Sequence, residues 1–556
     1  MKSPFWLSVA YYPEQWPRNE WDRDFAAIQK AGFSAVRMFE FAWGRMEPDD
    51  NRFDFSMMDE AIALAAKYGL SVILCTPTAA PPPWLWSKYP DILPVGVSGL
   101  RYGASGRRHG CPSNEAFLRY SVRITRQMAQ RYGKNPAVIA WQLDNEAGCH
   151  VNMRCYCESC QAKFRKWVEK KYGTVEALNE AWGLVFWSGE VNAFDQVCLH
   201  QNHLTLSNPA YELDVSRFQS DNWISFLQRQ AEIIREYSEE QAIVHNEAWY
   251  AEQINGYDLG KVLDFVGVDS YPQEAALNTM TDEMYFSMKR KPFAIMEMGA
   301  GAVASAGKHG MVMAHEGKVA MVVRHMMNGA FLCSLFRYRP SPSGGEMDAP
   351  ECGLVYHDAT PMPSYYAFER HHPLLERLGQ ELLEYDAGAR RISDVHERHK
   401  REYDAAIVLD YDDFFMIYSA PKGRNPNRYC RDILQTDYMQ DMLLWHDALS
   451  KCGLSVTFVP PNENLAPYKV VVAHEKWTIT RKFADKLTQY AKQGGIVVGA
   501  DRFGTHVPEG RMSCVTLPGC ATELFGVRYY DQLEATENPV TLELPNGKTL
   551  VSRKVI

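Results

Sequence analysis

The segment VIAWQLDNEAG, residues Val138–Gly148, is the strongest indication of the fold in the sequence. It opens with a short and mostly apolar run, then becomes polar at Asp144, Asn145 and Glu146 just before a glycine. Such a run is typical of a buried parallel strand. A carboxylate at its end needs a solvated cleft or a partner, because burying an unpaired charge is costly. We therefore predict a strand over Val138–Leu143 whose C-terminal end opens on a cleft.

Seven similar runs occur in the first part of the chain and predict seven more strands. Segments with apolar residues at helical spacing lie between them, and three of these stop directly before Gly32, Gly69 and Gly133. Eight alternations predict a (β/α)₈ barrel, with an α/β doubly wound sheet as the alternative. That alternative lacks its Gly-rich fingerprint after the first strand. The expected strands are Leu7–Tyr11, Ala35–Met38, Ser71–Thr76, Ala242–His245, Phe265–Asp269, Phe293–Met296 and Ala330–Phe336; the expected helices are Glu20–Ala31, Met58–Tyr68 and Glu115–Tyr132.

The pattern restarts after about residue 395 and predicts a smaller α/β domain with a parallel sheet. Its expected strands are Tyr403–Leu409, Val470–Ala473 and Gly495–Gly499, and its expected helices are Met439–Cys452 and Arg481–Gln493. We predict a catalytic barrel over residues 1–390, this α/β domain over 391–535, and a β segment over 536–556. The last segment is interpreted as a truncated or reduced third domain.

Composition narrows the class of protein. Lys and Arg number 59 against 68 Asp and Glu, for a net charge of −9, which argues against nucleic-acid binding. The chain has no apolar run long enough for a membrane span, and its N-terminus, MKSPFWLSVAYYPEQW, lacks the features of a signal peptide. Its 13 cysteines, an odd number, favour reduced thiols and a cytoplasmic location.

Two glutamates fall at the ends of predicted barrel strands. Glu146 ends the fourth, and Glu297 ends the seventh in PFAIMEMGAG, Pro292–Gly301. Active sites of such barrels lie at the C-terminal strand ends. Glycoside hydrolysis needs two carboxyl groups, which lie about 5–5.5 Å apart in retaining enzymes. The alternative is that either glutamate is only a strand-end ion-pair partner.

Four separated segments, in order, carry a resemblance to a known family. The sequence resembles the family forty-two glycoside hydrolases, which are β-galactosidases built from a barrel, an α/β trimerisation domain and a small β domain. The resemblance implies a retaining double displacement on small β-galactosides, with Glu146 as acid/base and Glu297 as nucleophile, in a homotrimer. The four segments are AVRMFEFAWGRMEPDDNRFDF (Ala35–Phe55), TPTAAPPPWL (Thr76–Leu85), RRHGCPSN (Arg107–Asn114) and WQLDNEAG (Trp141–Gly148).

The resemblance also implies four sugar contacts. Arg108 and Asn145 would bind hydroxyls around the reacting ring, and Tyr271 would steady the Glu297 carboxylate. Glu346 would bind the outer hydroxyls of the glycone. Arg108 paired with a structural acid, Tyr271 packed at the rim and Glu346 solvated in its Gly/Pro-rich loop are the alternatives.

Two departures from the family affect the glycone pocket. The loop Ala300–Gly310 has no Trp, and Ala349 stands where the family has His. The sugar is therefore left open: a β-galactoside is the first expectation, and a β-mannoside, a β-glucoside or an α-L-arabinopyranoside are the alternatives.

A cysteine cluster predicts a metal site. Cys155, Cys157 and Cys160 form C-x-C-x₂-C, and tetrahedral Zn²⁺ accepts closely spaced thiolates. The resemblance implies Cys111 as the fourth ligand, while Cys149 and His150 are local competitors. A closed four-thiolate site is structural, because it has no open position for substrate. Free, inert thiols are the alternative.

Three other classes of function fit the sequence less well. A non-catalytic sugar-binding protein has no need for two converging carboxylates. A metal-dependent barrel hydrolase requires His-x-His after the first strand, and AYYPEQW has no His. An amidotransferase-like second domain requires a nucleophilic Cys at a strand-to-helix turn, whereas Cys452 falls at a predicted helix end.

Overall fold

The chain forms two compact units, each built from more than one stretch of sequence. The first comprises Met1–Trp167, Cys198–Asn202 and Phe218–Arg401, and the second comprises Val168–Val197, His203–Arg217 and Glu402–Ile556. The computed structural model describes residues 4–104, 106–107, 110–149, 154–199, 208–248, 254–272, 274–300, 315–344, 352–419, 438–500, 502–528, 540–543 and 549–552.

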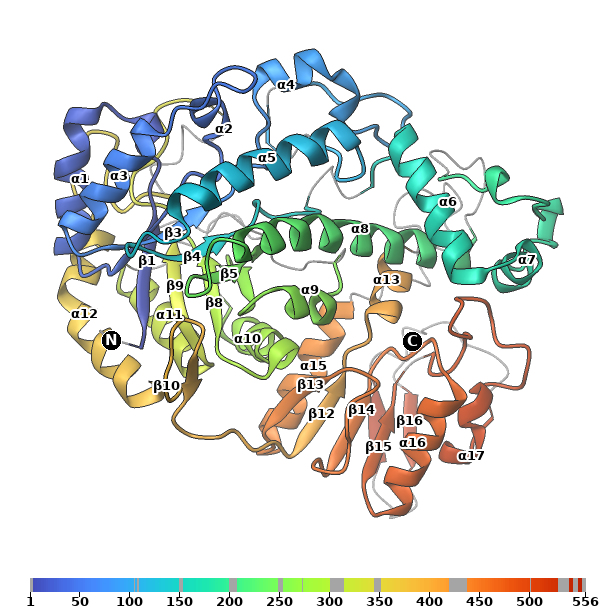
Figure 1. Cartoon of the computed structure of the whole chain (residues 1–556). Coiled ribbons are helices and arrows are strands. Elements are labelled where there is room, and N and C mark those ends of the chain that lie inside the picture. Colours follow the sequence, from blue (N-terminus) through green and yellow to red (C-terminus); the bar gives the residue numbers. More distant parts are fainter. Residues whose placement is uncertain are drawn as a thin grey trace. The chain divides into compact units, whose positions relative to one another are not determined.

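A parallel sheet forms the centre of the first unit (Figure 1). Its strand order is β5-β4-β3-β2-β1-β9-β8-β7-β6, and all its pairs are parallel. Only His245 separates β5 from β6, so the two ends of this order are parts of one strand and the sheet is a nearly closed barrel. The predicted barrel and all eight predicted strands are confirmed. The strands are β1 (Trp6–Ala10), β2 (Ala35–Met38), β3 (Ser71–Cys75), β4 (Val138–Gln142), β5 (Ala242–Val244), β6 (Asn246–Glu247), β7 (Gly267–Asp269), β8 (Phe293–Glu297) and β9 (Ala330–Leu335).

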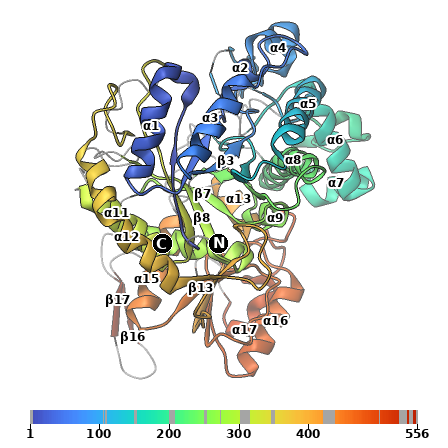
Figure 2. The ribbon, with the colours of Figure 1, turned by 60° about the vertical axis from the view of Figure 1, so that its left-hand side comes forward.

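Helices surround these strands in both views of the molecule (Figures 1 and 2). The three helices expected from periodicity are present as α1, α3 and α5. Gly32 and Gly69 follow the first two in the left-handed region, with φ of +89° and +70°. Gly133 does not: a side chain there would meet the Ala129 carbonyl, 2.6 Å from the Cβ position. The helices of this part are α1 (Arg18–Lys30), α2 (Trp43–Met46), α3 (Ser56–Lys67), α4 (Pro83–Lys88), α5 (Glu115–Tyr132), α9 (Gly256–Val262), α10 (Ala275–Lys289), α11 (His315–Met327) and α12 (Pro363–Leu382).

A second parallel sheet, with the order β13-β12-β14-β15, forms the centre of the second unit. This confirms the predicted smaller α/β fold. The strand β13 was not predicted. The strands are β12 (Ala405–Val408), β13 (Val456–Val459), β14 (Val470–Ala473) and β15 (Ile496–Gly499), and the helices are α13 (Tyr411–Ser419), α15 (Tyr438–Lys451), α16 (Arg481–Lys492) and α17 (Thr522–Phe525). Two antiparallel pairs complete the strands of the described chain, β10 (Leu383–Tyr385) with β11 (Val395–Glu397) and β16 (Val540–Glu543) with β17 (Thr549–Ser552).

A helical excursion after β4 also contributes to the second unit. It consists of α6 (Glu158–Tyr172), α7 (Val175–Trp182) and α8 (Pro209–Arg235). Within this unit the Arg217 guanidinium donates to both carboxylate oxygens of Asp412, at 2.8 and 2.7 Å, and to Asp214 at 2.9 Å. Asp214 is fully buried, so a charge on it depends on its contact with Arg217. No helix in the described part of the chain is long and apolar enough to cross a membrane.

Candidate active site

Glu297 lies at the end of β8 and is held by donors on both carboxylate oxygens. Arg37 donates to Oε1 at 2.6 Å, and Tyr271 donates to Oε2 at 2.6 Å. Burial raises the pKa of this carboxyl, but the Arg37 charge and the two hydrogen bonds outweigh it, so the pKa lies below its ordinary value. Glu297 is therefore ionised and fixed in orientation at neutral pH.

Arg37 is a fully buried cation beneath Glu297. All four residues of its strand, β2, are buried. Its guanidinium also contacts Glu40 at 3.0 Å and donates to Gln142 at 3.0 Å, while the Tyr12 hydroxyl donates to Glu40 at 2.6 Å. Sequence reasoning missed this residue, although a charged side chain inside a short apolar strand requires a buried partner and was a usable signal.

Glu146 follows β4 and lies close to Glu297. Its Oε2 lies 3.8 Å from the Arg107 guanidinium and accepts a 3.4 Å hydrogen bond from the Asn145 amide. One carboxylate oxygen from each of Glu146, Asp269 and Glu297 lies within 4.8 Å of the others. This spacing is on the short side of the two arrangements used for glycoside hydrolysis, in which carboxyl groups are about 5–5.5 Å or about 6.5–9.5 Å apart.

Two further buried polar residues, Asn246 and Asp269, belong to the same hydrogen-bond network as the two glutamates. The Asn246 amide donates to Asp269 at 2.9 Å, to Asn145 at 2.9 Å and, at a longer 3.4 Å, to Glu297. Sequence reasoning missed both Asn246 and Asp269. A signal was present: His245–Ala248 reads HNEA directly after a strand, close to the DNEA of Asp144–Ala147.

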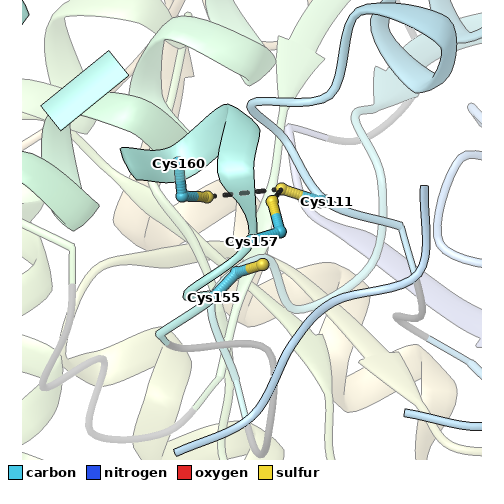
Figure 3. A group of neighbouring side chains, drawn as sticks. All are labelled: Cys111, Cys155, Cys157 and Cys160. Carbon is cyan, nitrogen blue, oxygen red and sulfur yellow. Dashed lines mark hydrogen bonds between the residues drawn. The ribbon is translucent and has the colours of Figure 1, made fainter. Parts of the chain in front are cut away.

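Four buried cysteines form a second cluster. The sulfurs of Cys111, Cys155, Cys157 and Cys160 lie within 4.8 Å of one another and are turned toward a common centre (Figure 3). Cys111 precedes α5, and the other three lie just before α6 and in its first turn. The Cys111 sulfur is 3.4 Å from that of Cys160 and 3.6 Å from that of Cys157. Thiolates around tetrahedral zinc lie about 3.8 Å apart, since each Zn–S bond is about 2.3 Å. The four residues therefore fit a closed zinc site.

Comparison with known proteins identifies the family. The β-galactosidase model of glycoside hydrolase family 42 matches residues 10–376, two thirds of the chain. The chain belongs to glycoside hydrolase family 42. A second model, that of the β-galactosidase trimerisation domain, matches residues 403–556 of this family 42 enzyme.

Individual relatives agree with this membership. A β-galactosidase from Halorubrum lacusprofundi is 32% identical over 540 residues, covering 94% of this chain and 73% of the relative. One from Thermus thermophilus is 35% identical over 493 residues, covering 84% and 71%. Among solved structures, the Halorubrum lacusprofundi β-galactosidase superposes with a TM-score of 0.86 at 31% identity, over 97% of this chain and 79% of that one. The β-galactosidase from Marinomonas ef1 gives 0.85 at 30% identity, over 98% and 82%.

The candidate residues of this glycoside hydrolase fall into two groups. Asn145, Glu146, Tyr271 and Glu297 belong to one network of contacts, together with the unforeseen Arg37, Asn246 and Asp269. Arg108 and Glu346 lie outside the described residues, as do Ala349, His150 and most of the loop after Glu297. Arg107, beside Arg108, is the guanidinium observed near Glu146.

Proposed function

We propose that this family 42 enzyme cleaves β-galactosides with retention of configuration, using Glu297 as nucleophile and Glu146 as acid/base. The observation that carries the proposal is the close approach of the Glu146 and Glu297 carboxylate oxygens, with Glu297 held ionised by Arg37 and Tyr271. An anion so close disfavours a second charge, so Glu146 is the group expected to hold a proton.

The first step forms a covalent bond between a Glu297 oxygen and the anomeric carbon. The bond from that carbon to the glycosidic oxygen breaks, and the leaving oxygen takes the proton from Glu146. In the second step water gives a proton to Glu146 and attacks the same carbon, and Glu297 leaves as a carboxylate. The donors on Glu297 stabilise the charge that returns to it in this step.

Product stereochemistry tests the mechanism. Proton NMR of a fresh reaction should show the β-anomer of the sugar first and the α-anomer only after mutarotation. Initial release of the α-anomer would exclude a Glu297 ester and require inversion.

Galactose is the proposed glycone because the relatives above are named β-galactosidases. β-Mannosides, β-glucosides and α-L-arabinopyranosides remain the alternatives, because the loop Ala300–Gly310 lacks the Trp, and position 349 the His, that the family resemblance predicts in the glycone pocket. A panel of nitrophenyl glycosides tests this: kcat/KM should be highest for the β-galactoside. A higher value on another member of the panel would replace the glycone and leave the mechanism standing.

For the cysteine cluster we propose a structural Zn²⁺ held by Cys111, Cys155, Cys157 and Cys160. The spacing of the sulfurs supports it, and four thiolates leave no position for substrate. Metal analysis of protein purified without chelator should give about one zinc per chain. A preparation that is active and free of zinc would contradict the proposal.

We propose a homotrimer, supported by the match to the trimerisation-domain model. Sedimentation equilibrium should give three times the chain mass of 63.4 kDa. We also propose a cytoplasmic location, because none of the twelve cysteines among the described residues forms a disulfide. The barrel (1–390), the α/β domain (391–535) and the β segment (536–556) are proposed as the domains.

A further inference from the structure

The loop that carries Glu146 has a backbone that its residues do not favour by themselves. Asp144 and Glu146 have φ of +52° and +46°, in the left-handed region that a Cβ disfavours. Such a conformation persists only when surrounding contacts fix it. Thr76 fixes the start of the loop by accepting the Asp144 N–H at 2.7 Å, and the Asp144 carboxylate accepts the Thr78 hydroxyl.

The far side of the loop is fixed by the neighbouring strand. The Glu146 N–H donates to Oδ1 of Asn246 at 3.2 Å, and the next N–H, that of Ala147, donates to Nε2 of His245 at 3.2 Å. Nδ1 of His245 faces the Leu143 carbonyl at 2.6 Å, so it must carry the ring hydrogen, and Nε2 is left to accept. Two consecutive side chains thus hold two consecutive N–H groups.

Asn246 also connects this loop to the strands that carry the other two carboxylates. It is fully buried, and its amide nitrogen has two hydrogens for three acceptors. The two 2.9 Å bonds, to Asn145 and to Asp269 on β7, are the strong ones, and Glu297 on β8 is third at 3.4 Å. One end of this side chain therefore holds the Glu146 backbone while the other end contacts the strands that carry Asp269 and Glu297.

We propose that Asn246 is a positioning residue. It holds the Glu146 carboxyl group where its proton can reach the oxygen of the glycosidic bond that Glu297 attacks. The inference rests on the proposed roles of these two glutamates. Without the Oδ1 acceptor, the Glu146 N–H loses its partner and the left-handed turn loses one of its supports. The carboxyl group then leaves the line of the glycosidic oxygen. A displacement of about 1 Å in such a group can cost about 10²-fold in rate.

The dependence of kcat/KM on the leaving group tests the proposal. The leaving group of a dinitrophenyl β-galactoside departs without help from an acid, whereas that of a phenyl β-galactoside needs a proton. Asn246→Ala should lower kcat/KM about 10²-fold on the phenyl substrate and less than about tenfold on the dinitrophenyl substrate. Asn246→Asp keeps an oxygen where Oδ1 accepts but replaces the amide donor by an oxygen that faces Asp269 and Glu297. Both values should therefore fall, while their ratio stays near that of the wild type. Should Asn246→Ala not fold, Asn246→Ser, whose hydroxyl is too short to reach the Glu146 N–H, should give the same selective loss.

The matched control is Asn328→Ala. The Asn328 amide also donates to a buried carboxylate, Asp282, at 2.9 Å, but Asn328 directly follows α11 and has no hydrogen bond to either glutamate among the described residues. It should leave the ratio unchanged. Equal losses on both substrates in Asn246→Ala, or a ratio in Asn246→Asp as low as in Asn246→Ala, would overturn the inference.

Glu146→Ala, measured beside them, separates this inference from the proposed function. If Glu146→Ala itself loses equally on both substrates, the acid/base assignment is wrong. If it loses selectively and Asn246→Ala does not, only the positioning role of Asn246 is wrong.

Discussion

Replacing Tyr271 by Phe removes one donor from Glu297 and leaves the others. The Tyr271 hydroxyl donates to Oε2 at 2.6 Å, while Arg37 contacts Oε1. Burial and the charges of Glu297 and Asp269 raise the pKa of Tyr271 well above its ordinary value, so the hydroxyl keeps its hydrogen throughout an enzymatic pH range. The variant therefore tests a single hydrogen bond to a carboxylate.

The size of the effect follows from that bond. A hydrogen bond to a charged group contributes about 1.5–3 kcal/mol, and a change of one pKa unit corresponds to about 1.4 kcal/mol. The bond favours the ionised form of Glu297, so its loss raises the pKa of that carboxyl by about one to two units. The acidic limb of the kcat/KM profile, which reports a group that must be ionised, should move to higher pH by the same amount.

The assay is kcat/KM for a nitrophenyl β-galactoside across the pH range of stability, with Tyr132→Phe as control. The Tyr132 hydroxyl also donates to a carboxylate, Asp59, at 2.8 Å, but that pair joins α5 to α3. An acidic limb that stays in place or moves to lower pH in Tyr271→Phe would refute the reasoning, as would an equal shift in Tyr132→Phe.

Three further outcomes are expected. Glu146→Ala should strongly reduce hydrolysis of natural disaccharides and spare the first step on activated aryl glycosides. Added azide should partly restore turnover, because it attacks the intermediate without a base. Equal losses on both substrate types would argue against Glu146. A 2-deoxy-2-fluoro galactoside should accumulate as an ester found on Glu297 by peptide mapping, and a label on Glu247 would reassign the nucleophile. Cys160→Ser should lower Tm and the zinc content before it changes kcat on protein that remains folded, because structural zinc contributes folding energy; an unchanged Tm with zinc lost would remove the structural role.

The barrel could be predicted because its signals are local. Each strand is a short apolar run, and the end of each strand shows where a polar side chain meets the cleft, which was enough to select Glu146 and Glu297. The strand β13 was missed although its run, VTFV, is as long as those of β2 and β14, which were predicted.

The support around the glutamates could not be predicted in the same way. Arg37 precedes Glu297 by 260 residues and Asn246 follows Glu146 by 100, so their contacts exist only once the strands are arranged around the barrel. The fourth cysteine of the cluster is also distant in sequence, since Cys111 is 49 residues from Cys160. Family resemblance, not spacing, selected it over Cys149.

The way the chain passes between its two units bears on how such enzymes diversify. Because Val168–Val197 and His203–Arg217 belong to the second unit, no single cut separates one unit from the other. Recombination at a joint near residue 402 would separate Asp412 from Arg217 of the same parent chain. Arg217 would keep its contact with Asp214 but lose its contact with Asp412. The bidentate Arg217–Asp412 pair is only partly buried, with side-chain exposures of 18% and 37%, so its loss costs less than that of a fully buried pair. The segment that carries Asp214 and Arg217 and the chain after residue 402 are therefore expected to be inherited together.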